Sequence, residues 1–261
     1  MGSWVEAALD HRLAPWLLAL VLAGLAEWRL GRHPATRPAA DRWWLGIGLW
    51  AIGSLALAAW PTSLPAASGA LAALPDVAQA GLVFVLADGL HYGVHRLMHA
   101  VPWLWRIHRV HHADADYDIA TALRFHPLEW LLSAAPVLVV AVWLGPTAQA
   151  MAWAFGAVVV WNVVQHMGLA RIRPLECRLG PWLLTPALHR EHHARTASGG
   201  TGNYGLLLAF WDRLFDTWQP PVEGTVVGVH DWRHGDDLLA NLLSPVASDQ
   251  AAGMTGEAPP R

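Results

Sequence analysis

The sequence predicts an all-α fold, an integral membrane bundle of about four to five helices with a cytoplasmic helical cap. Three observations support this fold class. The chain is 54% hydrophobic and only 14% charged, with a mean hydropathy of +0.30, whereas soluble domains have about 25% charged residues. Its apolar segments approach the roughly 20 residues that a membrane helix needs. Its histidines recur at helical spacing close to the ends of these segments.

Composition also excludes several classes of protein. The single cysteine, Cys177, excludes a disulfide framework, a CxxC zinc site and a cysteine-ligated iron–sulfur cluster within one chain. A net charge of −3 without a basic, aromatic-laced patch predicts no nucleic-acid partner. There is no GxGxxG dinucleotide fingerprint. The 17 tryptophans fit anchoring at membrane interfaces.

Residues 1–76 are predicted to form N-terminal membrane helices and loops. The apolar stretch Leu13–Ala26 follows a start without a basic region or an obvious cleavage site, so we expect a retained anchor rather than a signal peptide. A second helix is expected from Trp43 to about Trp60. The loop between them carries Arg29, Arg32, Arg37 and Arg42, and the following loop contains Pro61, Pro65 and Pro75 but no basic residue.

Residues 77–220 are predicted to form the domain that carries the chemistry. A third apolar segment begins near Val77 and runs through Asp88 into the first histidine motif. Residues 130–170 contain no charged side chain, and Gly145-Pro146 divides them, which predicts a helical hairpin over 128–144 and 148–166. Residues 221–261 are predicted to be a C-terminal segment with a disordered tail from about Ser244.

The distribution of arginine predicts which side of the membrane each loop occupies. The loop at 29–42 has four arginines and is placed in the cytoplasm, while the loop at 61–76 has none and is placed outside. The region 91–126 has four more arginines and is therefore also placed in the cytoplasm. The hairpin then crosses out and back, so every histidine motif is expected on the cytoplasmic side.

Three histidine motifs point to metal binding. Positions i, i+3 and i+4 share a helix face, so each HxxHH can aim three imidazoles at one point and HxxxH can aim two. Eight neutral ligands exceed what one ion uses, and imidazole suits Fe, Zn, Cu and Ni. We therefore expect a polynuclear site, with two ions. The motifs are HRLMH (His95, His99), HRVHH (His108, His111, His112) and HREHH (His189, His192, His193).

These motifs and their surroundings resemble a known family. The run DGLHYGVHRLMHAVPWLWRIHRVHHAD at 88–114 is followed by LRFHPLEW at 123–130, QHMG at 165–168, and HREHH with NYGLLLAFWDRLFDTW at 203–218. In that order they resemble the fatty acid hydroxylase/sterol desaturase superfamily, which are membrane-bound, histidine-rich di-iron oxygenases. The resemblance adds His166 as a ninth expected ligand. Many bacterial relatives have QHSN where this chain has QHMG.

The resemblance implies a fold, a reaction and partners. It implies two non-haem iron ions, O₂ as co-substrate, and hydroxylation of a membrane lipid or another hydrophobic substrate that enters sideways from the bilayer. Electrons are expected from a ferredoxin or a cytochrome with its reductase. The expected location is a bacterial-type inner membrane, multi-pass, with the site facing the cytoplasm. Three alternatives stay open: desaturation at the same site, a histidine-rich metal transporter, and a zinc-dependent lipid hydrolase.

Further residues are expected to support the ligands. An all-imidazole site is strongly positive, so carboxylates are expected to orient the rings through their second nitrogen. The candidates are Asp88, Glu191, Asp114 and Asp212. His91 is expected to be a hydrogen-bonding neighbour of His95 rather than a tenth ligand. Arg124, His126 and Glu129 are expected to form a structural or ring-supporting cluster, and His11, His33, His230 and His234 are expected at the surface.

Overall fold

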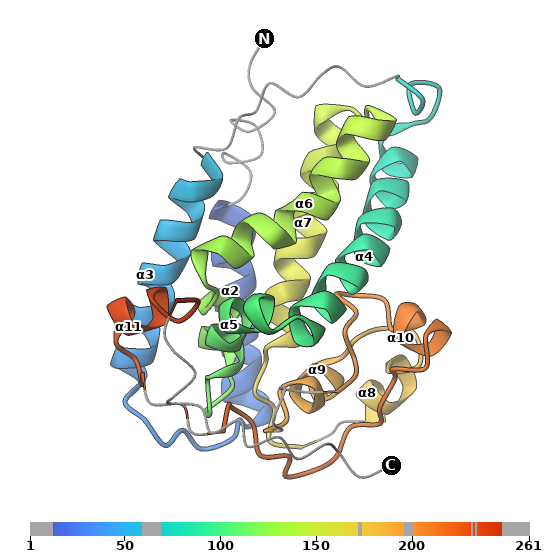
Figure 1. Ribbon diagram of the computed structural model, residues 1–261. Helices are drawn as coiled ribbons and strands as arrows, with labels where there is room; N and C mark the ends of the chain where they lie inside the picture. Colours follow the sequence, from blue (N-terminus) through green and yellow to red (C-terminus); the bar gives the residue numbers. More distant parts are fainter. Residues whose placement is uncertain are drawn as a thin grey trace.

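The computed structural model describes residues 13–58, 69–171, 174–195, 201–230, 232 and 234–246. Within these residues the chain is helical, and β-structure is limited to three isolated bridges. The all-α prediction is therefore confirmed. Five long helices lie side by side as a bundle (Figure 1): α2 (Leu13–Leu30), α3 (Ala39–Ala58), α4 (Asp76–Ala100), α6 (Pro127–Leu144) and α7 (Ala148–Gln165).

Shorter elements gather at one end of this bundle (Figure 1). Because α5 begins directly after α4 ends, with Pro102 at its first turn, the chain turns there instead of continuing the long helix. These elements form the cap-like part of the fold: α5 (Pro102–His112), η1 (Ile119–Leu123), α8 (Pro174–Leu179), α9 (Pro186–His192), α10 (Phe210–Leu214) and α11 (Leu238–Leu242).

The hairpin of α6 and α7 follows from its end residues. The ring of His126 caps α6 by accepting a hydrogen bond from the backbone N–H of Leu128 at 3.1 Å, and Pro127 occupies the first position. Gly145 ends α6 with φ of 58°, the left-handed conformation that glycine adopts without strain. The hydroxyl of Thr147 then caps α7. The predicted hairpin is confirmed to within one residue at each outer end.

The packing of the long helices brings the ends of α4 and α7 together. α4 packs against both α6 and α7, α2 packs against α7, and α3 packs against α6. Small residues allow close approach, because a Cβ added at Gly53 of α3 would clash with the ring of Trp130 on α6. An apolar cluster that includes Val83, Val137 and Met151 fills the space between α4, α6 and α7 on the side away from the cap.

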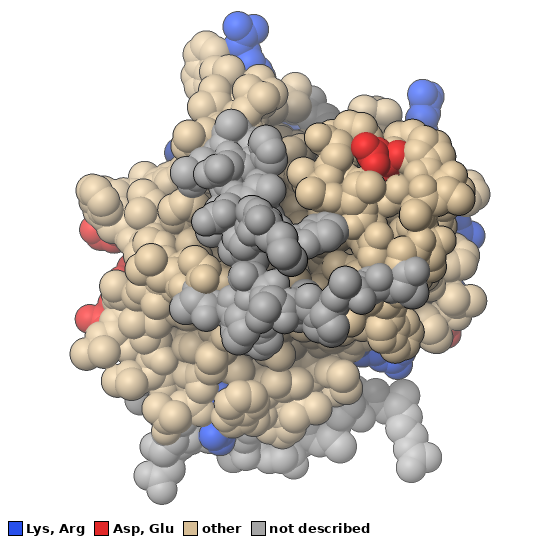
Figure 2. Space-filling view, turned by 90° about the horizontal axis from the view of Figure 1, so that it is seen from above, with Lys and Arg blue, Asp and Glu red and all other residues tan. Residues whose placement is uncertain are grey.

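Among the residues that the structure describes, three helices, α4, α6 and α7, are long and apolar enough to cross a membrane. This is fewer than the predicted four to five, and the number of spans stays a prediction. Exposed apolar side chains such as Leu17, Val21 and Leu55 cover the outer surfaces of α2 and α3. Figure 2 shows the end of the bundle away from the cap, where the side chains outside the grey atoms are mostly neither acidic nor basic.

An ion-pair network fixes the connection between α2 and α3 to the chain that follows α5. Arg32 pairs with Asp118 at 3.1 Å, and Arg37 pairs with Asp116 at 2.9 Å. The buried Arg42 pairs with Asp118 at 2.7 Å. Three of the four arginines that predicted a cytoplasmic loop therefore have specific carboxylate partners. Their charge is needed for packing, whichever side of the membrane they occupy.

The C-terminal segment differs from its prediction at its start. Ser244 is fully buried, and its hydroxyl accepts a hydrogen bond from the guanidinium of Arg109 at 3.0 Å. The prediction of a disordered tail from Ser244 is therefore wrong at that residue, because a partner on α5 holds it. Residues 247–261, His11 and Trp60 lie outside the described residues.

Candidate metal centre

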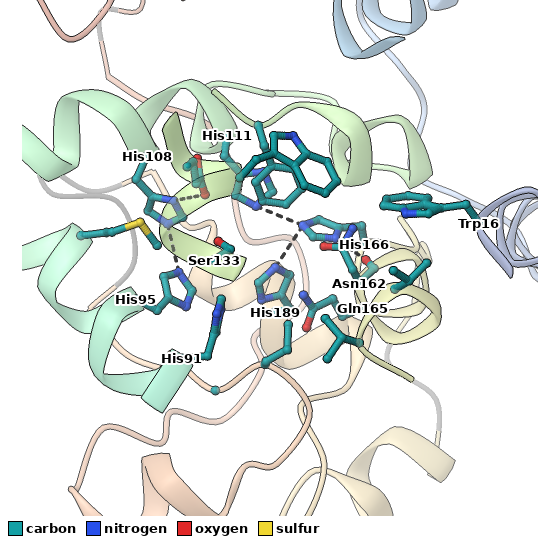
Figure 3. A pocket seen from close by; sticks show the side chains of 18 residues that line it. Trp16, His91, His95, His108, His111, Ser133, Asn162, Gln165, His166 and His189 are labelled. Atoms are coloured by element: carbon teal, nitrogen blue, oxygen red, sulfur yellow. Dashed lines mark hydrogen bonds and ion pairs between the residues drawn. The ribbon is translucent and has the colours of Figure 1, made fainter. Parts of the chain in front are cut away.

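Nine buried or half-buried histidines converge where α4, α5, α7 and α9 meet, and Figure 3 shows several of their rings turned towards one another. Their ring nitrogens form two groups, and within each group the nitrogens lie within 4.8 Å of one another. The five-histidine group consists of His95, His99, His108, His112 and His192, and the four-histidine group consists of His111, His166, His189 and His193.

Each HxxHH triplet is divided between the two groups. In HRVHH, His108 and His112 join the five-histidine group while His111 joins the other. In HREHH the division is reversed, and His192 alone joins the five-histidine group. The prediction that a triplet aims at one point is therefore wrong. Rings at i and i+4 are about 40° apart around a helix, whereas the ring at i+3 lies about 100° from i+4.

The spacing of the ring nitrogens suits metal coordination. Nε2 of His108 lies 3.0 Å from Nε2 of both His95 and His112. Nε2 of His166 lies 3.1 Å from Nε2 of His111 and of His189. Two nitrogens at about 2.1 Å from an ion, and at right angles, are roughly 3.0 Å apart, while tetrahedral ligands are roughly 3.4 Å apart. The observed spacing is therefore in the range expected for neighbouring ligands of one ion.

Hydrogen bonds to the other ring nitrogen hold five of these rings in position. A backbone carbonyl cannot donate, so a ring Nδ1 beside one must carry the proton, which leaves Nε2 free to bind a metal. The carbonyl of Tyr204 accepts from His95 at 2.8 Å, and the carbonyl of Gly202 accepts from His192 at 2.8 Å. The remaining three Nδ1 atoms pair with the carbonyl of Arg124 (His111), the carbonyl of Asn162 (His166) and Glu129 (His108).

The unpaired ring nitrogens indicate that these residues fit metal ions. Nε2 of His192 and both ring nitrogens of His193 are buried without a hydrogen-bond partner. Burial, and then the neighbouring histidines, hold the pKa of His193 well below its usual value, so the ring is neutral. The same two causes lower the pKa of His112. Neutral, desolvated imidazoles with free lone pairs are what a pair of metal ions requires.

Glu129, which is expected in a structural or ring-supporting cluster and not among the four carboxylates predicted to orient the rings, contacts a ring directly. Its Oε1 lies 2.6 Å from Nδ1 of His108. Asp212 supports a ring only indirectly, because it accepts hydrogen bonds from the backbone N–H groups of Tyr204 and Gly205 at 2.7 and 2.8 Å. It thereby fixes the loop whose Tyr204 carbonyl receives the His95 ring.

The other three carboxylates have different partners. Asp88 accepts from the backbone N–H of Leu207 and the indole of Trp211, so it holds the loop before α10 against α4. Glu191 accepts from the hydroxyl of Thr225 and the N–H of Val222. Asp114 pairs with Arg37, Arg42 and Thr121. None of these contacts involves a histidine ring, so the prediction that these three orient histidines is not supported by their hydrogen bonds.

The remaining predicted residues occupy distinct places. His91 lines the cavity described below, with its ring centroid 5.7 Å from that of His95, and is outside both groups. Arg124 donates to Val110 and Asp236, and His126 caps α6 and contacts the carbonyl of Leu242. Both have structural roles. Of the histidines predicted at the surface, His230 is exposed, while His33 and His234 are half-buried.

Two residues beside the site, Tyr117 and Gly168, are not among those predicted to support the ligands. Tyr117 is fully buried, its ring centroid lies 4.9 Å from that of His193, and its hydroxyl donates to the carbonyl of Gln165. Gly168, where this chain departs from QHSN, lies so close to this turn that an added Cβ would be 2.3 Å from the carbonyl of Tyr117. The glycine at position 168, where the sequence departs from QHSN, therefore lies where the backbone comes close to that of Tyr117.

A cavity of about 100 Å³ opens beside the two histidine groups. Its polar end is formed by rings from both groups, including His95, His108 and His189 (Figure 3). Its walls come from α2, α4, α6 and α7 and are mainly apolar, with Trp16, Met98, Phe125, Trp130, Val158, Val159 and Leu206. The cavity thus connects a candidate metal centre with the interior of the apolar bundle.

Two buried histidine groups at the end of an apolar helical bundle define a membrane-associated protein with a candidate metal pair. The chain belongs to the fatty acid hydroxylase family, whose model matches residues 80–217.

Curated relatives agree with this assignment. Ornithine lipid hydroxylase from Rhizobium tropici is 30% identical over 190 residues, which cover 71% of this chain and 55% of the relative. Human alkylglycerol monooxygenase is 31% identical over 150 residues, or 56% and 32% of the two chains. Methylsterol monooxygenase 1 from Danio rerio is 30% identical over 135 residues, or 51% and 44%. The matches thus span about half or less of each relative. The comparison with solved structures found no match.

Proposed function

We propose that this protein is an O₂-dependent hydroxylase, a monooxygenase, of a membrane lipid or another hydrophobic substrate at a non-haem di-iron centre. The observation that carries the proposal is the pair of histidine groups at the polar end of an otherwise apolar cavity. Hydrophobic walls select a hydrophobic substrate, and the buried imidazoles are ligands for redox-active metals. The relatives named hydroxylase and monooxygenase support the same reaction class.

The nine histidines are the proposed ligands, five for one iron and four for the other. Bound there, the irons would supply the activation of O₂ that oxidation of an unactivated C–H bond requires. Glu129, together with the carbonyls of Tyr204 and Gly202, would keep three of the rings oriented with Nε2 towards the metals. The four-histidine group offers one fewer protein ligand, which leaves more room there for an exogenous ligand.

The walls of the cavity would exclude water and position the substrate. Trp16, Phe125 and Val159 exclude bulk water and hold an apolar chain segment beside the rings. Hydroxylation by O₂ converts C–H to C–OH and releases water, which consumes two electrons and two protons. The sequence has no dinucleotide fingerprint for supplying those electrons, so we propose an external donor, a ferredoxin or a cytochrome with its reductase.

The proposed location is a bacterial-type inner membrane, with several spans and the site on the cytoplasmic face. The three apolar helices support membrane insertion. Exposed side chains on the cap support its contact with the same membrane: Trp182 is 69% exposed, and Phe210 and Phe215 are 52% and 51% exposed. The guanidinium of Arg213 lies over the Trp182 ring, 5.9 Å from its centroid. Aromatic rings beside a cation are typical of the interfacial region.

The alternatives are less well supported. Desaturation would use the same histidines, but the relatives are named for oxygen insertion. Transporters usually hold their ions near the middle of the membrane, whereas these histidines lie at one end of the bundle. A zinc hydrolase needs only three protein ligands and a water, which leaves six of the histidines without a role.

Lipidomics combined with metal analysis tests the proposal. Cells that express the chain are compared with cells that express His108→Ala, and their lipids are examined for a gain of one oxygen that requires O₂. We expect about two irons per purified chain and a product that disappears in the variant. Wild-type protein that contains iron but yields only lipids lacking two hydrogens would favour desaturation. Protein without redox metal whose activity survives the substitution would contradict the proposal.

A further inference from the structure

The chain has 17 tryptophans but only three tyrosines, and all three tyrosines are buried beside the candidate metal centre. The ring centroid of Tyr117 lies 4.9 Å from that of His193, and the ring centroid of Tyr204 lies 5.2 Å from that of His99. Tyr92 packs against Tyr204, with their centroids 6.2 Å apart. A phenol is one of the few side chains that readily loses a single electron. This concentration of phenols beside ligands for redox-active metals therefore points to electron transfer.

Two of the tyrosines belong to a row of aromatic rings that leads from the five-histidine group to the surface. The ring of Tyr204 also lies 5.6 Å from that of His192. Tyr92 in turn stacks on Phe215, with centroids 5.3 Å apart, and Phe215 is 51% exposed. Aromatic pairs in direct contact have centroids about 4.5–7 Å apart. Each ring of the row is thus in contact with the next, so an electron can pass from the surface to the histidines in short steps.

The hydroxyl of Tyr92 is connected to a carboxylate by two hydrogen bonds. The hydroxyl of Thr217 donates to Oδ1 of Asp212 at 2.7 Å, so the Tyr92 hydroxyl, 3.0 Å from the Thr217 oxygen, must be the donor in that contact. Burial raises the pKa of Asp212, which makes this carboxylate a stronger base. Arg96 donates to the Tyr92 oxygen at 3.3 Å. A phenol that loses an electron becomes strongly acidic, and Tyr92 has an acceptor for the proton that it then releases.

Tyr117 differs in the group that receives its hydrogen bond. Its hydroxyl donates to the backbone carbonyl of Gln165 at 2.8 Å. A carbonyl oxygen is too weak a base to take the proton of an oxidised phenol. Tyr117 is therefore close to the centre but poorly suited to lose an electron, and it serves as the internal comparison for Tyr92.

We propose that Tyr92 and Tyr204 form a one-electron relay that reduces the oxidised metal centre when the cavity holds no substrate. The inference rests on the proposed function, because an oxidant that breaks the C–H bond of an alkane also breaks the weaker O–H bond of a phenol. Without this relay, the oxidant would attack the nearest side chains, which are the imidazole ligands themselves. The relay thus adds a second activity to the site, which protects its ligands.

Tyr92 loses one electron and one proton in this step. The electron passes through the ring of Tyr204 and reduces the centre by one equivalent. The phenolic proton moves to the oxygen of Thr217 while the hydroxyl proton of Thr217 moves to Asp212, which leaves a neutral phenoxyl radical on Tyr92. A small one-electron reductant at the surface, such as ascorbate, then supplies an electron, and Asp212 returns the proton.

The test uses the full chain in lipid nanodiscs, loaded with iron, reduced without oxygen and then exposed to O₂ in the absence of substrate. Electron paramagnetic resonance detects the radical, and ring-deuterated tyrosine in the growth medium narrows the signal of a tyrosine radical and so identifies it. Wild-type protein should form this radical, and ascorbate should remove it. Tyr92→Phe should lose it, and so should Tyr204→Leu, which keeps the backbone carbonyl that holds His95. Tyr117→Phe is the matched control, with an unchanged radical yield per iron.

The proton route separates a relay from a packing role. Thr217→Val keeps the shape of the side chain without its hydroxyl, so radical formation should slow by about 100-fold, the contribution typical of a positioned proton acceptor. Thr217→Ser keeps the hydroxyl and should restore the rate. Peptide mass spectrometry after repeated exposure to O₂ gives a second readout. It should show several-fold more oxidation of the ligand histidines in Tyr92→Phe than in wild-type protein.

Three results would overturn the relay: an unchanged radical in Tyr92→Phe, equal rates in Thr217→Val and wild-type protein, or a radical that disappears instead in Trp105→Phe. The ring of Trp105 is a competing candidate because its centroid lies 5.2 Å from that of His99. Oxygenation of lipid by wild-type protein is measured in parallel. Protein that oxygenates lipid without forming a tyrosine radical overturns the relay alone. Protein that forms the radical but oxygenates no lipid overturns the proposed function alone, and protein that does neither overturns both.

Discussion

Nδ1 of His108 lies 2.6 Å from Oε1 of Glu129, a contact between α5 and the first turn of α6. It is the one direct contact between a carboxylate and a candidate ligand among the five ring hydrogen bonds described above. His108 is also the ring whose Nε2 lies 3.0 Å from two other ligand nitrogens. Glu129 therefore orients the ring at the middle of the five-histidine group.

Removing this carboxylate should weaken metal binding. Glu129→Ala is expected to lower affinity about 10- to 100-fold, as loss of a ligand-orienting partner generally does. Glu129→Gln should lose less, because its amide oxygen still accepts from the ring. Iron content after dialysis against graded chelator measures the effect, and Glu223→Gln, an exposed substitution, is the control. Equal retention in all three variants would show that the contact does not support the metal.

Adjacent histidines should affect different ions. His193→Ala leaves three ligands in its group, whereas His192→Ala leaves four in the other. We therefore expect His193→Ala to lose close to one iron per chain at chelator concentrations where His192→Ala retains more. Metal analysis by mass spectrometry checks this, with the exposed His230→Ala as control. Identical losses from the two variants would argue against the division of each triplet between groups.

Gly168 should resist substitution. A Cβ there would lie 2.3 Å from the carbonyl of Tyr117, which the backbone must move to accommodate. Gly168→Ala is expected to destabilise the protein by about 1–3 kcal/mol, the usual cost of overpacking. Gly156→Ala, where an added Cβ meets nothing within 4 Å, should be neutral or mildly stabilising. Thermal unfolding in detergent distinguishes the two, and similar melting temperatures would contradict the close approach.

The network around Asp116 should make the protein sensitive to acid. Burial alone would raise the pKa of Asp116, but hydrogen bonds from Thr36 and Arg37 outweigh it and hold the pKa below its usual value. A depressed folded-state pKa stabilises the protein above the unfolded value of about 3.9, and this contribution is lost as pH falls through the folded value.

Stability measured between pH 7 and pH 3 tests this expectation. The wild-type melting temperature should fall below about pH 4. Asp116→Asn should be less stable at pH 7 and should lose less on acidification, so the two curves converge. Curves that stay parallel down to pH 3 would show that Asp116 does not titrate between the folded and unfolded states.

The apolar segments and the breaker residues predicted much of the fold. Gly145 and Pro146 located the α6–α7 turn because few residues permit that conformation. His126 and Pro127 at the start of α6 are local signals of the same kind. The arginines of the α2–α3 connection also form ion pairs that no local signal shows, because their carboxylate partners follow α5 and lie about 75 or more positions away in the chain.

The candidate site was predictable at the level of residue type and only partly at the level of contacts. Eight of the nine histidines share helical spacing, which the sequence displays, and the ninth, His166, is expected only from the family resemblance. The ring partners at Gly202 and Tyr204 are backbone carbonyls, and every residue has one, so no sequence signal distinguishes them. The division of the triplets depends on how α5 and α9 face each other, which is a tertiary property. The same holds for Asp88, whose partners lie on a distant loop.

The division of each triplet has a consequence for assembly of the protein. The histidines of α5 and those of α9 would each bind both ions. The two sets of histidines are separated by roughly 80 residues, and closing a loop of that length costs conformational entropy. A loaded centre would therefore act as a reversible cross-link between distant parts of the chain. Metal binding would complete the fold of the cap as well as form the metal site. Newly made, metal-free chains would therefore be the form most sensitive to proteolysis.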